Sequence, residues 1–505
     1  MTARRFIFWF ALMVAAGWLA LELEARVGGG GGYSGGGGGG GSSSGGGGGG
    51  SSSGGGDGEA IFWLIYYWIL LCWHYPYIGL PATGLIIWWV RSNSDNVLER
   101  VVVASRIRSF EPEWKQLRAL DENFSVVLFR DFAYSLFAKL HEARGSGLLS
   151  GYKQFLNDKA ASKMESMSAN NLKDVQGVIV GALKIERVNL TRIKDTPPQV
   201  SVHVVFDANY TEIRDTKITD KKTTAVYTRQ KWVFKRRADV LSPPPEKITA
   251  LDCAGCGSPV ETGPDGACQH CGGTYPIGEH HWAVVSLKES QRRLVPPALT
   301  SSAEEVGTDL PTVIDPNYAE TRAAFLAANP SLYEERTLGR FQEIFLALQA
   351  AWGQRDLAGM RPYESDNLFQ NHRYWVEEYI RQDLRNVLED VSLDGIEMVK
   401  ITTDKFYDAI TCRMRAHMKE YTIDSDGRVV CGSLIWVDRH FTEYWTFIRG
   451  RGAGESAHDH LHCPNCGAEL KISMAGDCEY CDSKVTSGNF DWVASEIQQD
   501  EDYRG

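Results

Sequence analysis

Hydrophobic residues recur along the chain with two different periods. Three- and four-residue steps, typical of one helix face, occur at Phe132, Leu136 and Leu140, and again at Phe341, Ile344, Phe345, Leu348 and Trp352. Alternation of apolar and polar residues follows at residues 200–208 and 410–418, as in half-buried strands. Further strands are predicted at residues 226–235 and 434–448. Helices followed by a meander of long strands predict an α+β fold with a curved antiparallel sheet.

The first 91 residues have a different pattern. Residues 6–21 are uncharged and predict either a signal peptide or a first membrane segment within residues 1–27. Residues 28–58 are a Gly/Ser-rich tether, and residues 59–91 contain an apolar stretch long enough for one transmembrane segment. Arg4, Arg5 and Arg91 flank the apolar stretches. The positive-inside rule therefore places the folded domains in the cytoplasm and the tether outside.

Two halves of the remaining chain resemble each other. Trp282 corresponds to Trp492 at an offset of 210, and Trp232 corresponds to Trp445 at an offset of 213. The prolines of residues 291–330 predict a linker between the halves. The resulting division is a juxtamembrane region (92–120), a first domain (121–290), the linker (291–330), a second domain (331–499) and a tail (500–505).

Eight of the eleven cysteines form four Cys-x-x-Cys pairs, and each cysteine of the first half has a counterpart 210 positions later. The eight are Cys253, Cys256, Cys268, Cys271, Cys463, Cys466, Cys478 and Cys481. Four thiolates at this spacing favour one tetrahedral Zn²⁺ in each half, held in zinc ribbons at residues 251–275 and 461–485. An iron–sulfur cluster or redox dithiols are the alternatives. Because protein would fill all four positions, the two zinc sites are expected to be closed and structural.

Small residues after the cysteines support this interpretation. Glycine follows three of the four pairs and allows a tight turn around the metal, whereas Asp482 follows the fourth pair. His458, His460 and His462 precede Cys463, and they suggest either an additional metal site or a solvated loop.

The net charge of −11 argues against a nucleic-acid partner, because such affinity comes mainly from lysine and arginine contacts. The best local basic patch is Lys231 to Arg237, at a strand end. No nucleotide-binding loop or nucleophile constellation is present. Asp408 and His417, on or beside one strand, are the candidates for pocket chemistry, but no pairing between them is evident.

The second half resembles the Tim-forty-four-like (Tim44-like) family. Gln349, Ala351, Trp352, Asp356 and Leu357 carry its helical opening, residues 443–450 (EYWTFIRG) its penultimate strand, and residues 492–499 (WVASEIQQ) its last strand. The first half keeps the strand motifs but lacks the helical opening. The resemblance implies nuclear-transport-factor-two-like cones, with helices on a curved antiparallel sheet. It also implies that each ribbon is inserted in the last β-hairpin.

Bacterial relatives in this family are membrane-anchored, so the resemblance implies a scaffold or adaptor at the bacterial inner membrane. Its partners would be membrane lipid and a protein that the sequence does not identify, in protein transport or membrane-complex assembly. We therefore expect no enzymatic activity and no nucleic-acid partner. The alternatives are a cone-pocket enzyme or small-molecule binder, since such cones also serve as isomerases and dehydratases, and a zinc-ribbon nucleic-acid binder. The sequence does not indicate an oligomeric state.

Overall fold

A computed structural model of the protein describes residues 110–505 with gaps, the longest being 216–221, 246–257, 259–266, 300–309, 433–437 and 454–461. The expected signal peptide or first membrane segment, the glycine tether and the transmembrane segment therefore lie outside the described residues. No helix within the described part of the chain is long and apolar enough to cross a membrane.

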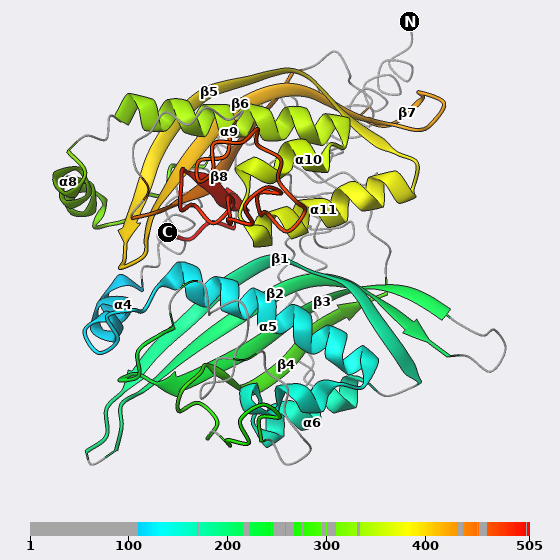
Figure 1. Cartoon of the computed structure of the whole chain (residues 1–505). Helices are drawn as coiled ribbons and strands as arrows, with labels where there is room; N and C mark the ends of the chain where they lie inside the picture. The colour runs from blue at the N-terminus through cyan, green and yellow to red at the C-terminus, as the bar shows by residue number, and fades with distance from the viewer. Residues whose placement is uncertain are drawn as a thin grey trace, which may run out of the picture. The chain divides into compact units, whose positions relative to one another are not determined.

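The first half contains a four-stranded antiparallel sheet. Its strands are β1 (Leu172–Thr191), β2 (Gln199–Arg214), β3 (Lys222–Arg237) and β4 (Ala283–Arg293), in that spatial order. They follow α4 (Glu111–Arg118), α5 (Val126–Ser146), the 3-10 helix η1 (Leu149–Phe155) and α6 (Asp158–Met167). In Figure 1, α5 lies across the strands.

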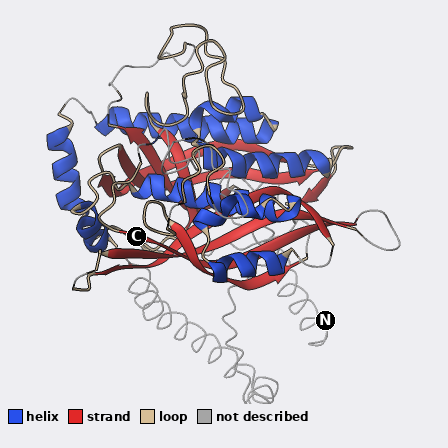
Figure 2. Ribbon diagram, turned by 60° about the horizontal axis from the view of Figure 1, so that its bottom comes forward, coloured by secondary structure: helices blue, strands red, loops and turns tan. Residues whose placement is uncertain are grey.

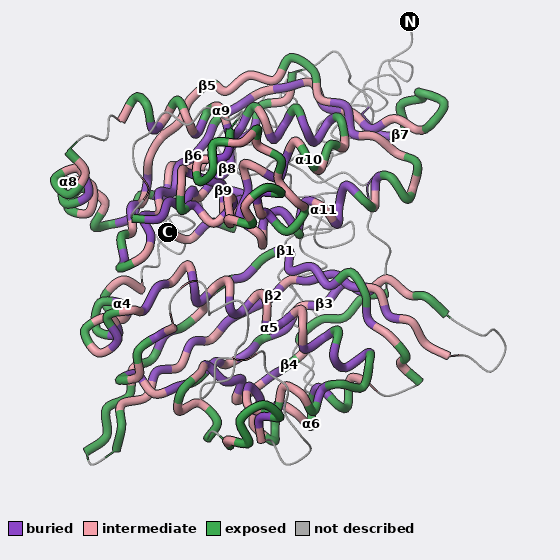
Figure 3. Tube along the Cα trace, viewed as in Figure 1, coloured by how far each residue is buried: buried purple, intermediate pink, exposed green. Residues whose placement is uncertain are grey.

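The periodicity of the sequence explains this packing. The Ser125 hydroxyl accepts a hydrogen bond from the Leu128 N–H at the start of α5, and Gly147 ends the helix at φ 74°. The predicted apolar faces, at residues 132, 136 and 140 of α5 and at alternate residues 200–208 of β2, are buried in one core. Figure 3 shows burial along α5 and the middle of the strands, with exposed strand ends.

The second half has a five-stranded antiparallel sheet. The spatial order is β5 (Arg385–Thr403), β6 (Tyr407–Ile423), β8 (Arg439–Gly450) and β9 (Val493–Gln499), with β7 (Val429–Cys431) paired to β6. The helices are α8 (Tyr318–Ala328), α9 (Glu334–Gln354), α10 (Leu357–Met360), the 3-10 helix η2 (Arg361–Tyr363) and α11 (Asp366–Arg381). Figure 2, which colours helices blue and strands red, shows helices lying along strands in the described part of the chain.

The core of the second half confirms the predicted apolar faces. The five α9 residues with helical spacing and the alternating β6 residues from Ile410 to Met418 are buried together. Residues 291–330, predicted to be a linker, include α8, and Phe325 of this helix lies in the same core. Pro311 and Pro316 precede α8, so they do not interrupt its hydrogen bonds. This segment therefore contributes structure to the second half.

Equivalent tryptophans are held in the same way in the two halves. The Arg236 guanidinium carbon lies 4.8 Å from the Trp282 ring centroid, and that of Arg449 lies 4.9 Å from Trp492. Beside these pairs, the N–H of Arg237 donates to the Gly278 carbonyl, and the N–H of Gly450 donates to the carbonyl at position 488. Both acceptor glycines have positive φ, 76° and 78°. Shared element order and shared contacts thus accompany the sequence repeat.

Candidate metal centre

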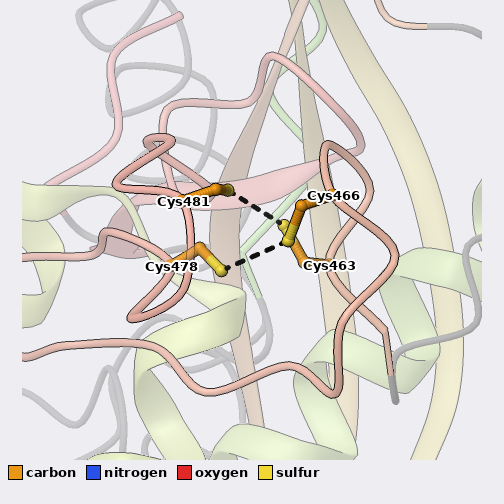
Figure 4. A group of neighbouring side chains, drawn as sticks. All are labelled: Cys463, Cys466, Cys478 and Cys481. Atoms are coloured by element: carbon orange, nitrogen blue, oxygen red, sulfur yellow. Dashed lines mark hydrogen bonds between the residues drawn. The ribbon is translucent and has the colours of Figure 1, made fainter.

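Four cysteines of the second half lie close together in the segment that connects two neighbouring strands. Strands β8 and β9 are antiparallel neighbours, and the chain between them carries all four. Their sulfur atoms lie within 4.8 Å of one another (Figure 4). The Sγ of Cys463 is 3.8 Å from that of Cys481, and the Sγ of Cys466 is 4.0 Å from that of Cys478. Zinc–sulfur bonds of about 2.3 Å in a tetrahedron place sulfurs about 3.8 Å apart, so the donor set fits zinc.

The backbone turns explain how each pair presents its sulfurs. In the first turn the N–H of Gly467 donates to the Cys463 carbonyl at 2.8 Å, and in the second the N–H of Asp482 donates to the Cys478 carbonyl at 2.9 Å. The donors have φ of 73° and 56°, in the left-handed region. Asp482 therefore adopts the conformation that Gly272 and Gly467 adopt after two of the other pairs. Aspartate is among the residues that tolerate it best.

The first half shows the same turn at the pair that the structure describes. The N–H of Gly272 donates to the Cys268 carbonyl at 2.8 Å, and φ of Gly272 is 69°. Cys253 and Cys256 lie outside the described residues. One half of the predicted first site thus has the backbone geometry of the second site.

The electrostatics of the sulfur cluster favour a bound cation. Hydrogen bonds from Asn465 and Ser483 lower the pKa of Cys481 to about 6 and stabilise its thiolate. A hydrogen bond from the Ala468 backbone lowers the pKa of Cys466, but desolvation and the neighbouring sulfurs raise it to about 11. Cys481 thus ionises readily, whereas ionisation of a second cysteine beside it is unfavourable. A divalent cation would offset the repulsion between the sulfurs because it stabilises all four thiolates together.

A buried arginine connects the cysteine segment to the helices. The Arg361 guanidinium donates to the carbonyls of Met474 at 3.2 Å, Ala475 at 2.9 Å and Glu364 at 3.0 Å. It also pairs with Asp366, and its side chain is almost fully buried. Charged hydrogen bonds from Arg361 therefore hold the cysteine-containing segment against η2 and α11, while its own turns order the backbone around the sulfurs.

The remaining predicted candidates have separate partners. The Asp408 carboxylate pairs with Arg449 at 3.2 Å, whereas the His417 imidazole pairs with Asp394 at 2.8 Å. The structure thus does not join Asp408 to His417. His462 is exposed, and the other two histidines near Cys463 lie outside the described residues.

The predicted basic patch is largely neutralised. Lys231 pairs with Glu186 at 2.9 Å, and Arg237 pairs with Asp239 at 2.8 Å. Arg236 is buried against an aspartate. Little free positive charge remains here for phosphate contacts.

One buried hydrogen-bonded pair in the second half was not predicted from the sequence. The His372 Nδ1 hydrogen-bonds the Glu364 carboxylate, and both side chains are inaccessible. At an offset of 208, Glu364 corresponds to Leu156 of the first half and His372 corresponds to Met164. The offset follows from equivalent β-bridges: Leu156 pairs with Val284 of β4, and Glu364 pairs with the residue at position 494 of β9. Aligning the halves would have exposed this polar-for-apolar exchange.

Comparison with known proteins supports the resemblance of the second half. Residues 318–458 match the family model described as the Tim44-like domain. The match begins at the first residue of α8 and ends before the four clustered cysteines. No curated protein matches the chain.

Proposed function

We propose that the protein is a membrane-anchored adaptor without catalytic activity, with its folded part on the cytoplasmic side of a bacterial inner membrane. The match of residues 318–458 to the Tim44-like domain carries the proposal. The apolar stretch at residues 61–90 supports the anchor, and the Cys-x-x-Cys pairs suit a reducing compartment. Its partners would be a protein and membrane lipid, in protein transport or membrane-complex assembly.

The two halves would be copies of one nuclear-transport-factor-two-like module, each with a zinc ribbon in its last hairpin. The repeated arginine–tryptophan contacts and glycine turns support the duplication. Each ribbon would hold one structural Zn²⁺, giving two ions per chain. Metal binding of this kind contributes about 10–16 kcal/mol in peptides, enough to order a segment with little core.

The second ribbon is suited to contact a protein partner. Tyr480 is 55% exposed and Met474 is 39% exposed, although both lie in a segment held by the cysteine cluster and Arg361. Aromatic and methionine side chains are enriched in protein interfaces. A rigid loop that presents them loses little conformational entropy on binding.

Membrane fractionation tests the anchor. The full chain should stay with membranes after high-salt and alkaline washing, whereas a chain lacking residues 1–91 should move to the soluble fraction. Recovery of the full chain in the soluble fraction would contradict the anchor.

Site-specific photocrosslinking tests the adaptor role in native membranes. A photoreactive amino acid at Tyr480 should give a discrete adduct of protein or lipid. The same amino acid at Ile380, an exposed apolar position on α11, is the matched control and should not give it. Identical patterns at both positions, or adducts at neither, would contradict the proposed surface.

The buried His372–Glu364 pair favours a second candidate, small-molecule binding or acid–base chemistry in the second module. A carboxylate that orients an imidazole is a common arrangement for proton transfer. A ligand of this site should raise the melting temperature of the full chain, and His372→Met should abolish the shift. Equal shifts in both proteins would place the ligand elsewhere.

A further inference from the structure

Two histidines and one aspartate meet on the sheet of the second half, apart from the cysteine cluster in sequence. His417 of β6 lies directly opposite His440 of β8 in the strand register. On the other side, β5 has a register shift between Leu393 and Gly395, and Asp394 lies at this irregularity. The shift brings its carboxylate to His417, with Oδ1 and Oδ2 at 2.8 and 2.9 Å from Nδ1.

The three side chains lie on the sheet face opposite the helical core. In β6 the neighbours of His417, Ala416 and Met418, are buried in that core, so alternation directs His417 outward. Asp394 and His440 are exposed. Any ion bound here would therefore be accessible from solvent.

The donor atoms are close enough to share one ion. One ligand atom from each of the three side chains lies within 4.8 Å of the others, and the His417 and His440 ring centroids are 5.2 Å apart. Two ligands at about 2.1 Å from a tetrahedral zinc ion lie about 3.4 Å apart. The ligand atoms must move closer to reach this spacing, and the three side chains are at least partly exposed, which leaves them room to change rotamer.

The surrounding charges distinguish this group from ordinary cross-strand pairs. Two residues before and after His417 on β6, Arg415 pairs with Glu397 and Lys419 pairs with Asp390. Each of these pairs joins one cation to one carboxylate. At His417 a second imidazole is added directly opposite. Two protonated imidazoles at this spacing would repel, whereas two neutral imidazoles and a carboxylate form a common ligand set for a divalent metal.

We propose that Asp394, His417 and His440 form an open, exchangeable site for a divalent transition metal, with Zn²⁺ as the best fit. Two nitrogen ligands and one oxygen ligand leave at least one coordination position. Water fills this position, or one donor group from a partner. The site differs from the cysteine centre, where protein supplies all four ligands.

Metal stoichiometry of the purified full chain tests the proposal. After equilibrium dialysis against micromolar free Zn²⁺, the His417→Gln/His440→Gln variant should bind one ion fewer than the wild type. A short exposure to a mild chelator should remove the same one ion from the wild type. The comparison holds whether or not the cysteine centres are loaded, because only the difference is measured.

Matched variants separate ligand loss from a general change of the surface. Arg415→Gln and Lys419→Gln alter the neighbouring pairs on the same face and should bind as many ions as the wild type. Asp394→Asn should weaken binding at the exchangeable site at least about tenfold, with an unchanged circular dichroism spectrum. Equal ion counts in the wild type and the double histidine variant would overturn the proposal, as would loss of the ion in both control variants.

Discussion

Arg361 offers a direct test of how the second cysteine segment is attached to its module. The Arg361→Met variant keeps most of the side-chain volume but removes every donor. Three carbonyl groups and the Asp366 carboxylate then lose a buried charged partner. A second variant, Gly476→Ala, perturbs the same contact. Gly476 has φ 92°, and a Cβ there would collide with Arg361 Nη2.

The magnitude follows from the contacts that cross to the segment. Two of the carbonyl acceptors, on Met474 and Ala475, belong to it. Hydrogen bonds to a charged group contribute about 1.5–3 kcal/mol each, so loss of the two should weaken docking by about 3–6 kcal/mol. The Asp366 side chain is 48% exposed and keeps Lys484 as a second partner, so the loss of its pair with Arg361 adds little. The loss of docking free energy is smaller than the free energy of Zn²⁺ binding at a structural site, about 10–16 kcal/mol. The metal should therefore stay bound while the segment detaches.

Hydrogen exchange of the full chain measures the detachment. Peptides spanning residues 470–490 should exchange at least about a hundredfold faster in Arg361→Met and Gly476→Ala, since about 1.4 kcal/mol corresponds to a factor of ten. Zinc content should be unchanged. Arg373→Met removes an exposed pair with Glu377 and is the matched control, with an effect of at most about 0.5 kcal/mol. Unchanged exchange in both test variants, or loss of the metal with the arginine, would refute this reasoning.

Three further predictions concern single sites. Asp482→Gly should keep the Co²⁺ affinity of the cysteine centre, whereas Asp482→Val should lower it, because φ of 56° suits glycine and strains a β-branched residue. Equal affinities of the two variants in a Co²⁺ titration would contradict this prediction. Glu364→Leu alone leaves a buried imidazole without its hydrogen-bond partner and should cost about 1–3 kcal/mol in urea unfolding, whereas adding His372→Met, which recreates the apolar pair of the first half, should restore or exceed wild-type stability. Burial, followed by the nearby Arg144 charge, lowers the pKa of His141 well below its usual value. Below about pH 6.5 the unfolded chain therefore takes up a proton that the folded chain does not. The free energy of unfolding should fall by about 1.4 kcal/mol for each unit by which the pH is lowered there, and urea unfolding of His141→Gln should show a smaller slope.

The periodic part of the fold could be predicted because burial is regular. Alternation from Ile410 to Met418 identified the buried face of β6, and helical spacing from Phe341 to Trp352 identified that of α9. The Cys-x-x-Cys spacing likewise identified the four side chains that meet in the second half. These features depend on residues close in sequence, so a single sequence contains the information.

Other features depend on residues that only the fold brings together. The Asp394–His417–His440 group draws one residue from each of three strands, and its aspartate lies at a register shift that alternation does not reveal. Glu364 is an extended residue between η2 and α11, and His372 lies on α11, so no single periodic pattern or recognisable motif joins them. The prolines of residues 291–330 predict a linker, but Pro311 and Pro316 precede helix α8, where proline does not interrupt helical hydrogen bonds.

Zinc-edge X-ray absorption of the purified full chain tests the metal centre most directly. The His417→Gln/His440→Gln variant is the sample of choice, because it lacks the histidine ligands of the proposed open site. We predict a first coordination shell of four sulfur atoms at about 2.3 Å. A shell dominated by nitrogen or oxygen, or a chain that binds no zinc with its cysteines reduced, would contradict the assignment of the cysteine clusters as structural zinc centres.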